Sequence, residues 1–190
     1  MSGTMNELKR ALLLFGTMAL ILGIIYPLVI TGISQVIFPS QANGEIFTVN
    51  GKIVGSELIG QNFSSPQYFH GRPSAIGYNA STSGGSNYGP TNKNLVDRVN
   101  ISISEIKAED GLSDNATIPA DLVLASASGL DRYISVESAE LQVPRIAKAR
   151  NLNESVIKDL ITKNKEVPFP GIGEPVVNVL KLNIALDGIH

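Results

Sequence analysis

The feature that most constrains this chain is an apolar segment near its N-terminus, residues 11–38, in which no side chain is charged. A helix needs about 20 apolar residues to cross a hydrocarbon core of roughly 30 Å, and this segment is longer than that. It therefore predicts a single transmembrane helix over residues 11–38. Pro27 lies inside the segment and has no backbone N–H, so we expect either a kink there or a neighbouring helix that satisfies the freed carbonyl.

A cleaved signal peptide is the alternative interpretation of this segment. Ser40-Gln41-Ala42 has the small-x-small form of a cleavage site, and Pro39 precedes it. The apolar part of a signal peptide is usually about 7–15 residues long, which is much shorter than residues 11–38. An uncleaved anchor is therefore the favoured interpretation.

The charges that flank the segment predict its orientation. Lys9 and Arg10 directly precede it, whereas the first charge after it is Glu45. Because positive charges are retained on the cytoplasmic side, we expect residues 1–10 in the cytoplasm and residues 39–190 outside it. The chain would then be a single-pass protein of the plasma membrane whose anchor contacts lipid.

Composition and motif content exclude several functions. A net charge of -2 and a pI near 5.7 argue against a nucleic-acid partner, which would require a basic surface. The absence of cysteine excludes disulfides, a thiolate nucleophile and Cys-based metal sites. Neither common phosphate-binding loop occurs, and no Asp-Lys-Thr-Gly-Thr stretch is present to form an aspartyl phosphate. His70 and His190 are the only histidines and lack visible partners for zinc, so we expect no metal and no firmly bound cofactor.

Residues 39–190 mix strand and helix signals without a regular βαβ repeat, which predicts one α+β domain. Residues 47–49 and 52–54 are expected to form a β-hairpin, because Asn50-Gly51 suits a type I′ turn. An unpaired turn between two loops is the alternative. Residues 70–92 are rich in Gly, Ser and Asn, but they have neither high charge nor a simple repeat. An ordered functional loop is therefore favoured over a disordered linker.

Start and stop signals predict helices in the second half of the chain. Pro90 suits a helix start and Gly111 suits its end. Ser135 is a plausible N-cap, and Pro144 should break that helix and begin a second one. Asn153 can cap a further helix.

Two other segments are predicted to be strands. Residues 121–125 form a short apolar run between polar residues, which is typical of a buried strand. Residues 178–186 alternate between apolar and other side chains, and this period of two makes them the clearest predicted strand of the chain.

Two sets of polar side chains could carry chemistry. His70 with a loop serine would be the base of a membrane-anchored hydrolase, although no Gly-x-Ser-x-Gly motif accompanies it. Asp121 and Asp131 could serve in acid–base chemistry or cation binding. The favoured alternative is structural: Asp131 forms an Asx turn, and Asp121 accepts backbone hydrogen bonds.

Stretches of the chain also follow one another in an order found in a known family. They are residues 55–61 (GSELIGQ), 68–75 (YFHGRPSA), 78–79 (YN), 83–87 (SGGSN) with 89–92 (GPTN), 121–123 (DLV) with 125–131 (ASASGLD), 142–147 (QVPRIA) with 149–150 (AR), and 178–183 (NVLKLN). With the anchor they cover nearly the whole chain, and they resemble the C subunit of the Kdp potassium-transporting P-type ATPase, the KdpC family. The family usually continues Gly-Leu-Asp with Pro-His-Ile-Ser, whereas this chain has Arg132-Tyr133-Ile134-Ser135. No role of that family histidine therefore carries over.

The resemblance implies an accessory, non-catalytic subunit of a complex that imports K⁺ with high affinity at the expense of ATP. In that family a channel-like subunit carries the ion and a P-type subunit hydrolyses ATP. The C subunit is held to assist assembly and to raise the ATP affinity of the hydrolysing subunit. The stretch 83–87 has been likened to a nucleotide-binding signature.

The resemblance also supplies the candidate site residues. Those of the partner or nucleotide loop are Gly71, Arg72, Pro73, Ser74, Asn79, Ser83, Gly84, Gly85, Ser86, Asn87, Gly89, Pro90 and Asn92. A secondary surface comprises Asp121, Ser126, Ser128 and Asp131. In the anchor, Gly16, Gly23 and Gly32 are expected to allow close approach of partner helices.

The predicted topology argues against direct contact between ATP and this chain, because the 70–92 loop would lie outside the cell. Phosphates also require cations or a helix N-terminus, for which Arg72, Lys93 and the helix after Pro90 are the local candidates. A docking surface for the outer face of the channel-like subunit is the favoured interpretation, with any effect on ATP affinity arriving by coupling. A solitary extracellular binding module, stable without partner subunits, is the remaining alternative.

Overall fold

The computed structural model describes residues 2–49, 51–168 and 172–189. Asn50 of the predicted turn and the histidine His190 lie outside the described residues. The chain divides into two compact units, Met1–Ile46 and Phe47–His190, and each unit is described by itself.

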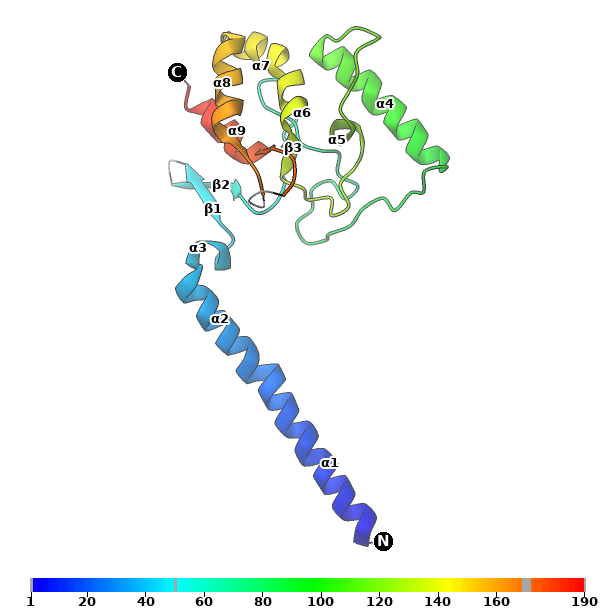
Figure 1. Ribbon diagram of the computed structural model, residues 1–190, viewed down its shortest axis with the longest axis vertical. Coiled ribbons are helices and arrows are strands. Elements are labelled where there is room, and N and C mark those ends of the chain that lie inside the picture. Colours follow the sequence, from blue (N-terminus) through cyan, green and yellow to red (C-terminus); the bar gives the residue numbers. More distant parts are fainter. Residues whose placement is uncertain (1, 50, 169–171, 190) are drawn as a thin grey trace. The chain divides into compact units, whose positions relative to one another are not determined.

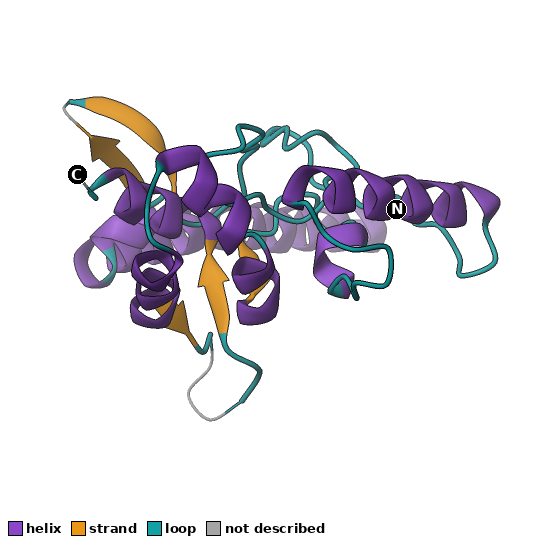
Figure 2. Cartoon of the chain, turned by 90° about the horizontal axis from the view of Figure 1, so that it is seen from above, coloured by secondary structure: helices purple, strands orange, loops and turns teal. Residues whose placement is uncertain are grey.

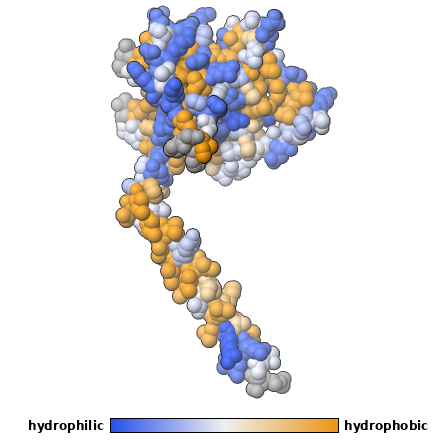
Figure 3. Space-filling view, in the orientation of Figure 1, coloured by the Kyte–Doolittle hydropathy of each residue, from blue (hydrophilic) through white to orange (hydrophobic). Residues whose placement is uncertain are grey.

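The first unit is dominated by one long helix. In it α1 (Ser2–Leu20) continues through a π-helical segment, η1 (Ile21–Ile25), into α2 (Tyr26–Ile37). Its large apolar side chains are exposed, and Figure 3 shows apolar surface along the helix except near its N-terminal end. The stretch Gly3–Ile37 is long and apolar enough to cross a membrane. The unit is thus compatible with the predicted single-pass anchor.

The irregularity expected at Pro27 takes the form of the π-helical segment directly before it. The Tyr26 N–H donates to the carbonyl oxygen of Ile21, five residues earlier, and Pro27 follows in the first turn of α2. A π turn holds an extra residue and changes the hydrogen-bond spacing. The helix therefore accommodates the missing donor of Pro27 without ending.

A folded turn closes the C-terminal end of this unit. A short helix, α3 (Pro39–Ala42), follows α2. The side-chain amides of Gln35 and Asn43 exchange hydrogen bonds of 3.1 and 3.4 Å. The Glu45 N–H donates to the Ser40 carbonyl over 2.9 Å. The chain therefore folds back beside the end of the helix instead of extending away from it.

The second unit, Phe47–His190, begins within the predicted hairpin. β1 (Ile46–Val49) pairs with β2 (Lys52–Ser56) in a two-stranded sheet. Gly51 lies at a positive φ of 77°, which fits the turn chemistry expected there. The hairpin prediction is confirmed, while the Asn50 half of its turn lies outside the described residues.

A second, three-stranded antiparallel sheet lies at the centre of the second unit. Its order is β3 (Tyr133–Ser135), β5 (Val176–Asn178), β4 (Lys165–Glu166). Ile134 pairs with the fully buried Val177 in the middle strand. The predicted α+β class is confirmed.

Three helices contact this sheet: α6 (Val136–Leu141), α8 (Glu154–Asn164) and α9 (Val179–Asp187). Helix α7 (Val143–Arg150) packs against α6 and α8, and Figures 1 and 2 show the cluster of helices beside the sheet. Their inner faces form one apolar core, which includes Phe69, Ile134, Ile146, Ile157, Ile161, Val177, Leu182 and Leu186. The longer helix α4 (Lys93–Asp110) lies on the other side of the domain from α8 and α9, with the short helix α5 (Ala120–Val123) nearby.

Several predicted helix boundaries are confirmed. The Ser135 hydroxyl accepts from the Ser138 N–H at the start of α6, and the Asn153 side chain accepts from the Ser155 N–H at the start of α8. Pro144 lies in the first turn of α7, just after the break at Gln142. At Ser135 and Asn153 the boundary is set by a side chain that accepts a hydrogen bond from a free N–H of the first helical turn. At Pro144 it is set by a residue that has no N–H to donate.

The start of α4 differs from the prediction by a few residues. The helix begins at Lys93 and is capped by the side chain of Asn92, which accepts from the Asn94 N–H. Pro90 lies before the cap, in a turn where the Asn92 N–H donates to the Gly89 carbonyl. The predicted end is confirmed, because Gly111 adopts the left-handed conformation that closes a helix.

The strand predicted over residues 121–125 is wrong, because the segment forms the helical turn α5. The Leu124 N–H donates to the Ala120 carbonyl over 2.8 Å. Leu122 and Val123 are buried as expected. A short apolar run reports burial but cannot distinguish a buried helical turn from a buried strand.

The strand predicted over residues 178–186 is also wrong. Strand β5 ends at Asn178, whose side chain caps α9 by accepting from the Lys181 N–H. The buried residues of the helix include Val179, Leu182, Asn183 and Leu186, which have helical spacing. The polar Asn183 on this buried face produced the apparent alternation of period two.

Candidate functional site

The 70–92 loop is held against a second loop, residues 124–131, by hydrogen bonds to the backbone. The Ser126 N–H donates to the Pro73 carbonyl over 3.2 Å, and the Gly84 N–H donates to the Ser128 carbonyl over 2.9 Å. The Ser74 hydroxyl donates to the Gly129 carbonyl over 2.7 Å. The structure thus brings the predicted partner loop and the predicted secondary surface together as one pair of crossing loops.

Two glycines allow this close crossing. A Cβ atom at Gly85 would lie 3.0 Å from the Ala127 carbonyl oxygen. At Gly129, where φ is +69°, a Cβ atom would lie 2.5 Å from the Ile76 side chain and 2.8 Å from the Gly84 carbonyl oxygen. Both positions need a residue without a side chain, which explains part of the glycine content of these loops.

Arg72, the only charged residue of the 70–92 loop, is already paired. Its guanidinium lies 2.9 Å from the Asp131 carboxylate. The other carboxylate oxygen of Asp131 accepts from the Tyr133 N–H over 3.0 Å, which is the predicted Asx turn. The Tyr78 hydroxyl donates to the Arg72 carbonyl, and burial, with the nearby Asp131 charge, raises the pKa of Tyr78 to about 12. Arg72 therefore fastens the two loops together.

Asp121 also has structural partners. It accepts from the Ser135 N–H over 2.7 Å and from the Ser138 hydroxyl over 2.6 Å. It therefore joins the short helix α5 to the start of α6. Asp121 and Asp131 thus make the contacts that the structural interpretation predicted, each with its own partners.

The remaining predicted loop residues fall into two groups. Ser83 donates to the Ser128 carbonyl, Asn79 accepts from the N–H and hydroxyl of Ser81, and Asn92 caps α4. By contrast, the exposed residues Asn87, Gly89 and Pro90 form part of an outer edge of the loop. Residues 73–92 contain no charged side chain, so the loop's own side chains on this edge are polar and neutral.

Arg98 is a basic group near this loop that sequence reasoning missed. It comes from α4, lies 5.8 Å above the Tyr88 ring and donates to the Ser86 hydroxyl over 3.4 Å. Arg98 lies on a helix outside the loop, so nothing in the sequence indicated that its side chain would contact the loop. Within residues 83–87, the Gly84 N–H donates to the Ser128 carbonyl and is therefore already engaged.

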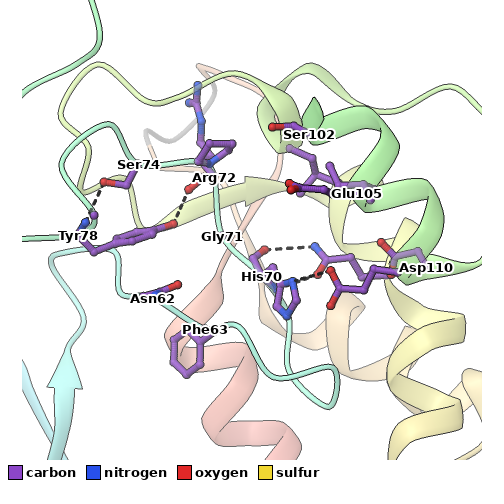
Figure 4. A pocket seen from close by; sticks show the side chains of 16 residues that line it. Asn62, Phe63, His70, Gly71, Arg72, Ser74, Tyr78, Ser102, Glu105 and Asp110 are labelled. Atoms are coloured by element: carbon purple, nitrogen blue, oxygen red, sulfur yellow. Dashed lines mark hydrogen bonds and ion pairs between the residues drawn. The ribbon is translucent and has the colours of Figure 1, made fainter. Parts of the chain in front are cut away.

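His70 lies at one end of a pocket between α4 and the 70–78 part of the loop (Figure 4). Its Nε2 donates to the Ser65 carbonyl over 3.1 Å, which leaves Nδ1 facing Glu109 at 3.7 Å. Burial and the positive charge of Arg145 lower the pKa of His70. The lowered pKa favours the neutral form of the ring. Within the described residues its ring contacts include no serine hydroxyl, so the geometry gives the hydrolase hypothesis no base–nucleophile pair.

The pocket has a volume of about 410 Å³ and a mixed lining. Ser102, Glu105 and Ile106 line it from α4, while Phe63 and Tyr78 lie across from them (Figure 4). Within the described ranges, no three His, Cys, Asp or Glu side chains are grouped so that they could hold a metal ion. The pocket thus offers carboxylates and a phenol but no metal-binding set.

Sequence reasoning missed the buried polar network beneath the pocket. The side chains of Arg145 and Asp110 are each 4% exposed and lie 2.7 Å apart. Arg145 also donates to the Gln142 side chain and to the carbonyls of Pro66 and Tyr68. The only available signal was an arginine and a glutamine inside the otherwise apolar stretch 142–147.

Two buried side-chain amides continue this network along the chain. Gln142 accepts from the His70 N–H over 2.7 Å and donates to the His70 carbonyl over 3.2 Å. Asn183 makes the same pair of contacts with Phe69, at 2.8 and 3.0 Å. The backbone of Phe69 and His70 therefore bonds to two side-chain amides, whereas in a sheet it would bond to the backbone of a neighbouring strand.

In the separate helical unit, the predicted packing glycines are accessible. At Gly16, Gly23 and Gly32 no atom lies within 4 Å of the position that a Cβ would occupy, apart from the helix's own neighbouring backbone. The helix surface is therefore open at these three positions.

Comparison with known proteins gives one consistent family. Residues 8–188 match the family model described as "KdpC: K+-transporting ATPase, c chain". Proteins named "Potassium-transporting ATPase KdpC subunit" are similar to this chain over nearly their full length. That of Dechloromonas aromatica is 51% identical over 96% of this chain and 97% of its own. Those of Bradyrhizobium diazoefficiens and Caldanaerobacter subterraneus are 47% and 48% identical, covering 96% and 95% of this chain and 97% and 94% of their own.

Proposed function

This chain belongs to the KdpC family, the c chain of K⁺-transporting ATPases, and from this premise we propose that its outer domain docks on the channel-like subunit of the complex. Its relatives are named as a subunit of the ATPase, so the chain is an accessory subunit and not a stand-alone enzyme. The proposal concerns which surface does the docking, on which side of the membrane, and with what effect on ATP use.

The outer domain faces away from the cytoplasm in this proposal. Lys9 and Arg10 precede the apolar span, and the positive-inside rule retains them in the cytoplasm of the cell. The helix then anchors the chain in the plasma membrane, and its open positions at Gly16, Gly23 and Gly32 receive partner helices.

The observation that carries the docking proposal is the neutral outer edge of the 70–92 loop. Arg72 is paired inward with Asp131, and residues 73–92 carry no charge of their own. The basic group beside them, Arg98 of α4, lies over the Tyr88 ring and donates to the Ser86 hydroxyl. A neutral polar surface costs less to desolvate than a charged one, and its backbone and amide groups can bond a partner directly. The crossing with residues 124–131 fixes the loop before it binds, which reduces the ordering cost of docking.

Assembly and a higher ATP affinity of the hydrolysing subunit follow from this docking. The chain biases the complex toward the conformation that binds ATP, and it does so by coupling through the channel-like subunit. ATP itself does not contact the 83–87 stretch, which lies outside the cell and has its Gly84 N–H engaged by Ser128.

The test places a charge on the docking edge. In the complete complex, Asn87→Asp is compared with Asn115→Asp, a substitution of another exposed asparagine outside the two crossing loops. Asn87 has a positive φ of 54°, which aspartate also tolerates. We expect Asn87→Asp to reduce the amount of this chain that co-purifies with the channel-like subunit and to raise the KM for ATP. Equal co-purification and equal KM for both variants would contradict the docking surface.

The orientation is tested separately. The chain has no cysteine, so Asn115→Cys provides a single label site. In intact cells we expect a membrane-impermeant maleimide to react with this cysteine, and a cysteine in place of Ser2 to react only after permeabilisation. The reverse pattern would place the outer domain in the cytoplasm and restore direct contact with ATP as a possibility.

A further inference from the structure

The β1–β2 hairpin exposes apolar side chains on both of its faces. Ile53 is 71% exposed and its neighbour Val54 is 40% exposed, and adjacent residues of a strand point to opposite faces. In β1 the same holds for Ile46 at 54% and Val49 at 41%. In the part of the chain that the structure describes, these two strands pair only with each other. A hairpin packed on a domain by one face would not need aliphatic residues on the other.

The base of the hairpin is tied to the end of the long apolar helix. Ile46, the first residue of β1, is the last residue of the compact unit that contains the helix. If residues 38–45, which link α2 to β1, were fully extended, they could span roughly 28 Å. The amide pair of Gln35 and Asn43 and the bond from the Glu45 N–H to the Ser40 carbonyl fold this link back on itself. The first residue of the hairpin therefore lies close to the point where the helix would leave a bilayer.

The charges of the hairpin suit a lipid surface. Between residues 46 and 56 the only charged side chain is Lys52, at the start of β2. A lysine can lay its aliphatic stem along apolar surroundings and hold its ammonium among anionic headgroups. The nearest acids along the chain lie outside the strands, at Glu45 and Glu57, and Glu57 is paired with Lys181.

We propose that the β1–β2 hairpin lies in the boundary between headgroups and acyl chains of the leaflet from which the helix emerges. This inference rests on the proposed membrane span of the helix. A lipid boundary surrounds an inserted element and so covers both apolar faces, whereas a protein partner docked on one face would leave the other in water. Hydrated headgroups can also form hydrogen bonds with backbone groups at the edges of a hairpin. The hairpin is then a second membrane contact, and it limits how the outer domain can tilt.

The test uses single cysteines in the full chain, which has none of its own. Ile53→Cys carries an environment-sensitive fluorophore, and the chain is reconstituted in vesicles of phosphatidylcholine and phosphatidylglycerol that contain spin-labelled lipids. Leu28→Cys, within the apolar helix, is the reference for lipid contact, and Glu137→Cys, on the exposed side of α6, is the reference for water. We expect the label at position 53 to be quenched like a shallow lipid contact and the label at 137 to be unaffected.

The possible outcomes separate the hairpin from the span. A label at 53 that behaves like the one at 137, while the label at 28 is quenched, overturns the hairpin inference and leaves the span intact. An unquenched label at 28 removes the span and with it the premise. Loss of quenching at 53 when the complete complex is assembled would show that a partner protein covers the hairpin, and this would also overturn the inference.

A charge substitution provides the second measurement. With the fluorophore at Val54→Cys, adding Ile53→Asp should abolish the quenching, because a carboxylate resists transfer out of water. Adding Val156→Asp, at an exposed aliphatic position on α8, should leave it unchanged. Quenching that survives Ile53→Asp would contradict insertion of the hairpin.

Discussion

Around its three-stranded sheet the α+β domain is held by apolar packing, whereas the loop region beside α4 is held by hydrogen bonds and buried charges. Helix α9 buries Val179, Leu180, Leu182 and Leu186, while α4, twice as long, fully buries no apolar residue. The loop region compensates with the pair Arg145–Asp110, the amides of Gln142 and Asn183, and bare backbone contacts. Apolar contacts tolerate small adjustments, but such polar contacts depend on every partner being present.

This comparison predicts that the largest loss of stability from one substitution comes from the polar network around Arg145 and Asp110. Arg145→Met leaves Asp110 buried without its partner, which should lower the free energy of unfolding by about 3–5 kcal/mol. Lys148→Met, at an exposed position of the same helix, is the matched control and should change it little. Urea unfolding of the full chain in detergent, followed by tyrosine fluorescence, provides the measurement.

A double variant distinguishes charge from packing in this result. If the loss arises from the unpaired carboxylate, adding Asp110→Leu to Arg145→Met should recover a large part of it, because no buried charge remains. A double variant that is less stable than Arg145→Met alone would show instead that the lost hydrogen bonds to the Pro66 and Tyr68 carbonyls dominate.

On the apolar side, Leu182→Ala should lower the free energy of unfolding by about 2–5 kcal/mol, because Leu182 is fully buried in the core. Val156→Ala, on the partly exposed side of α8, should cost much less. Hydrogen exchange sharpens the comparison, since Leu182→Ala should weaken protection in β5, α8 and α9 together. Loss of protection confined to α9 would mean that the sheet and its helices do not unfold as one unit.

The crossing of the two loops should open locally when its glycine contact is removed. Gly129→Ala combines a positive φ with overlap against Ile76 and the Gly84 carbonyl, for a cost of about 1–3 kcal/mol. Gly111→Ala is the control, because it has a similar φ of +65° but open space around the new Cβ. We expect faster hydrogen exchange at the Gly84 and Ser126 amides in Gly129→Ala, with α8 unchanged. Equal exchange in the two variants would show that the overlap is relieved without separating the loops.

The same division explains what the sequence could predict. Features set by neighbouring residues were predictable: the apolar span, the hairpin at Gly51, the caps at Ser135 and Asn153, and the break at Pro144. Apolar spacing alone misassigned residues 121–125 and 178–186, because burial by distant segments decides between helix and strand there. The contact between the 70–92 and 124–131 loops was not predicted: family resemblance named residues of both loops as candidates, but no local pattern places the two loops side by side.

The polar network was beyond local reasoning for a different physical reason. Arg145 contacts Asp110 and the carbonyls of residues 66 and 68, which are far away along the chain. The sequence does not distinguish a buried arginine from an exposed one, and only the fold shows whether partners for a buried arginine are present. Asn183 misled the strand prediction because its polar side chain points into the domain to pair with the Phe69 backbone.

The smallest expected effect is the contribution of His70, which borders the polar network, to the pH dependence of the free energy of unfolding. Burial and Arg145 lower the pKa of His70 in the folded chain, with Glu109 and Asp110 partly opposing them. In the unfolded chain the imidazole titrates near its ordinary pKa of 6.5. Above that pH neither state takes the proton, so the stabilisation from a neutral His70 is fully present. Below it the unfolded chain binds the proton first, so stability falls as the pH approaches the folded pKa.

His70→Asn removes this titration while keeping a polar side chain at the pocket. Urea midpoints measured between pH 8 and pH 5 should therefore fall more steeply for the natural chain than for His70→Asn, and only below about pH 6.5. His190 and the carboxylates are common to both chains, so the difference between the two profiles isolates His70. A constant difference across this range would mean that His70 titrates alike in the folded and unfolded chains. The contact of its ring with Glu109 at 3.7 Å would then have to be strong enough to cancel burial.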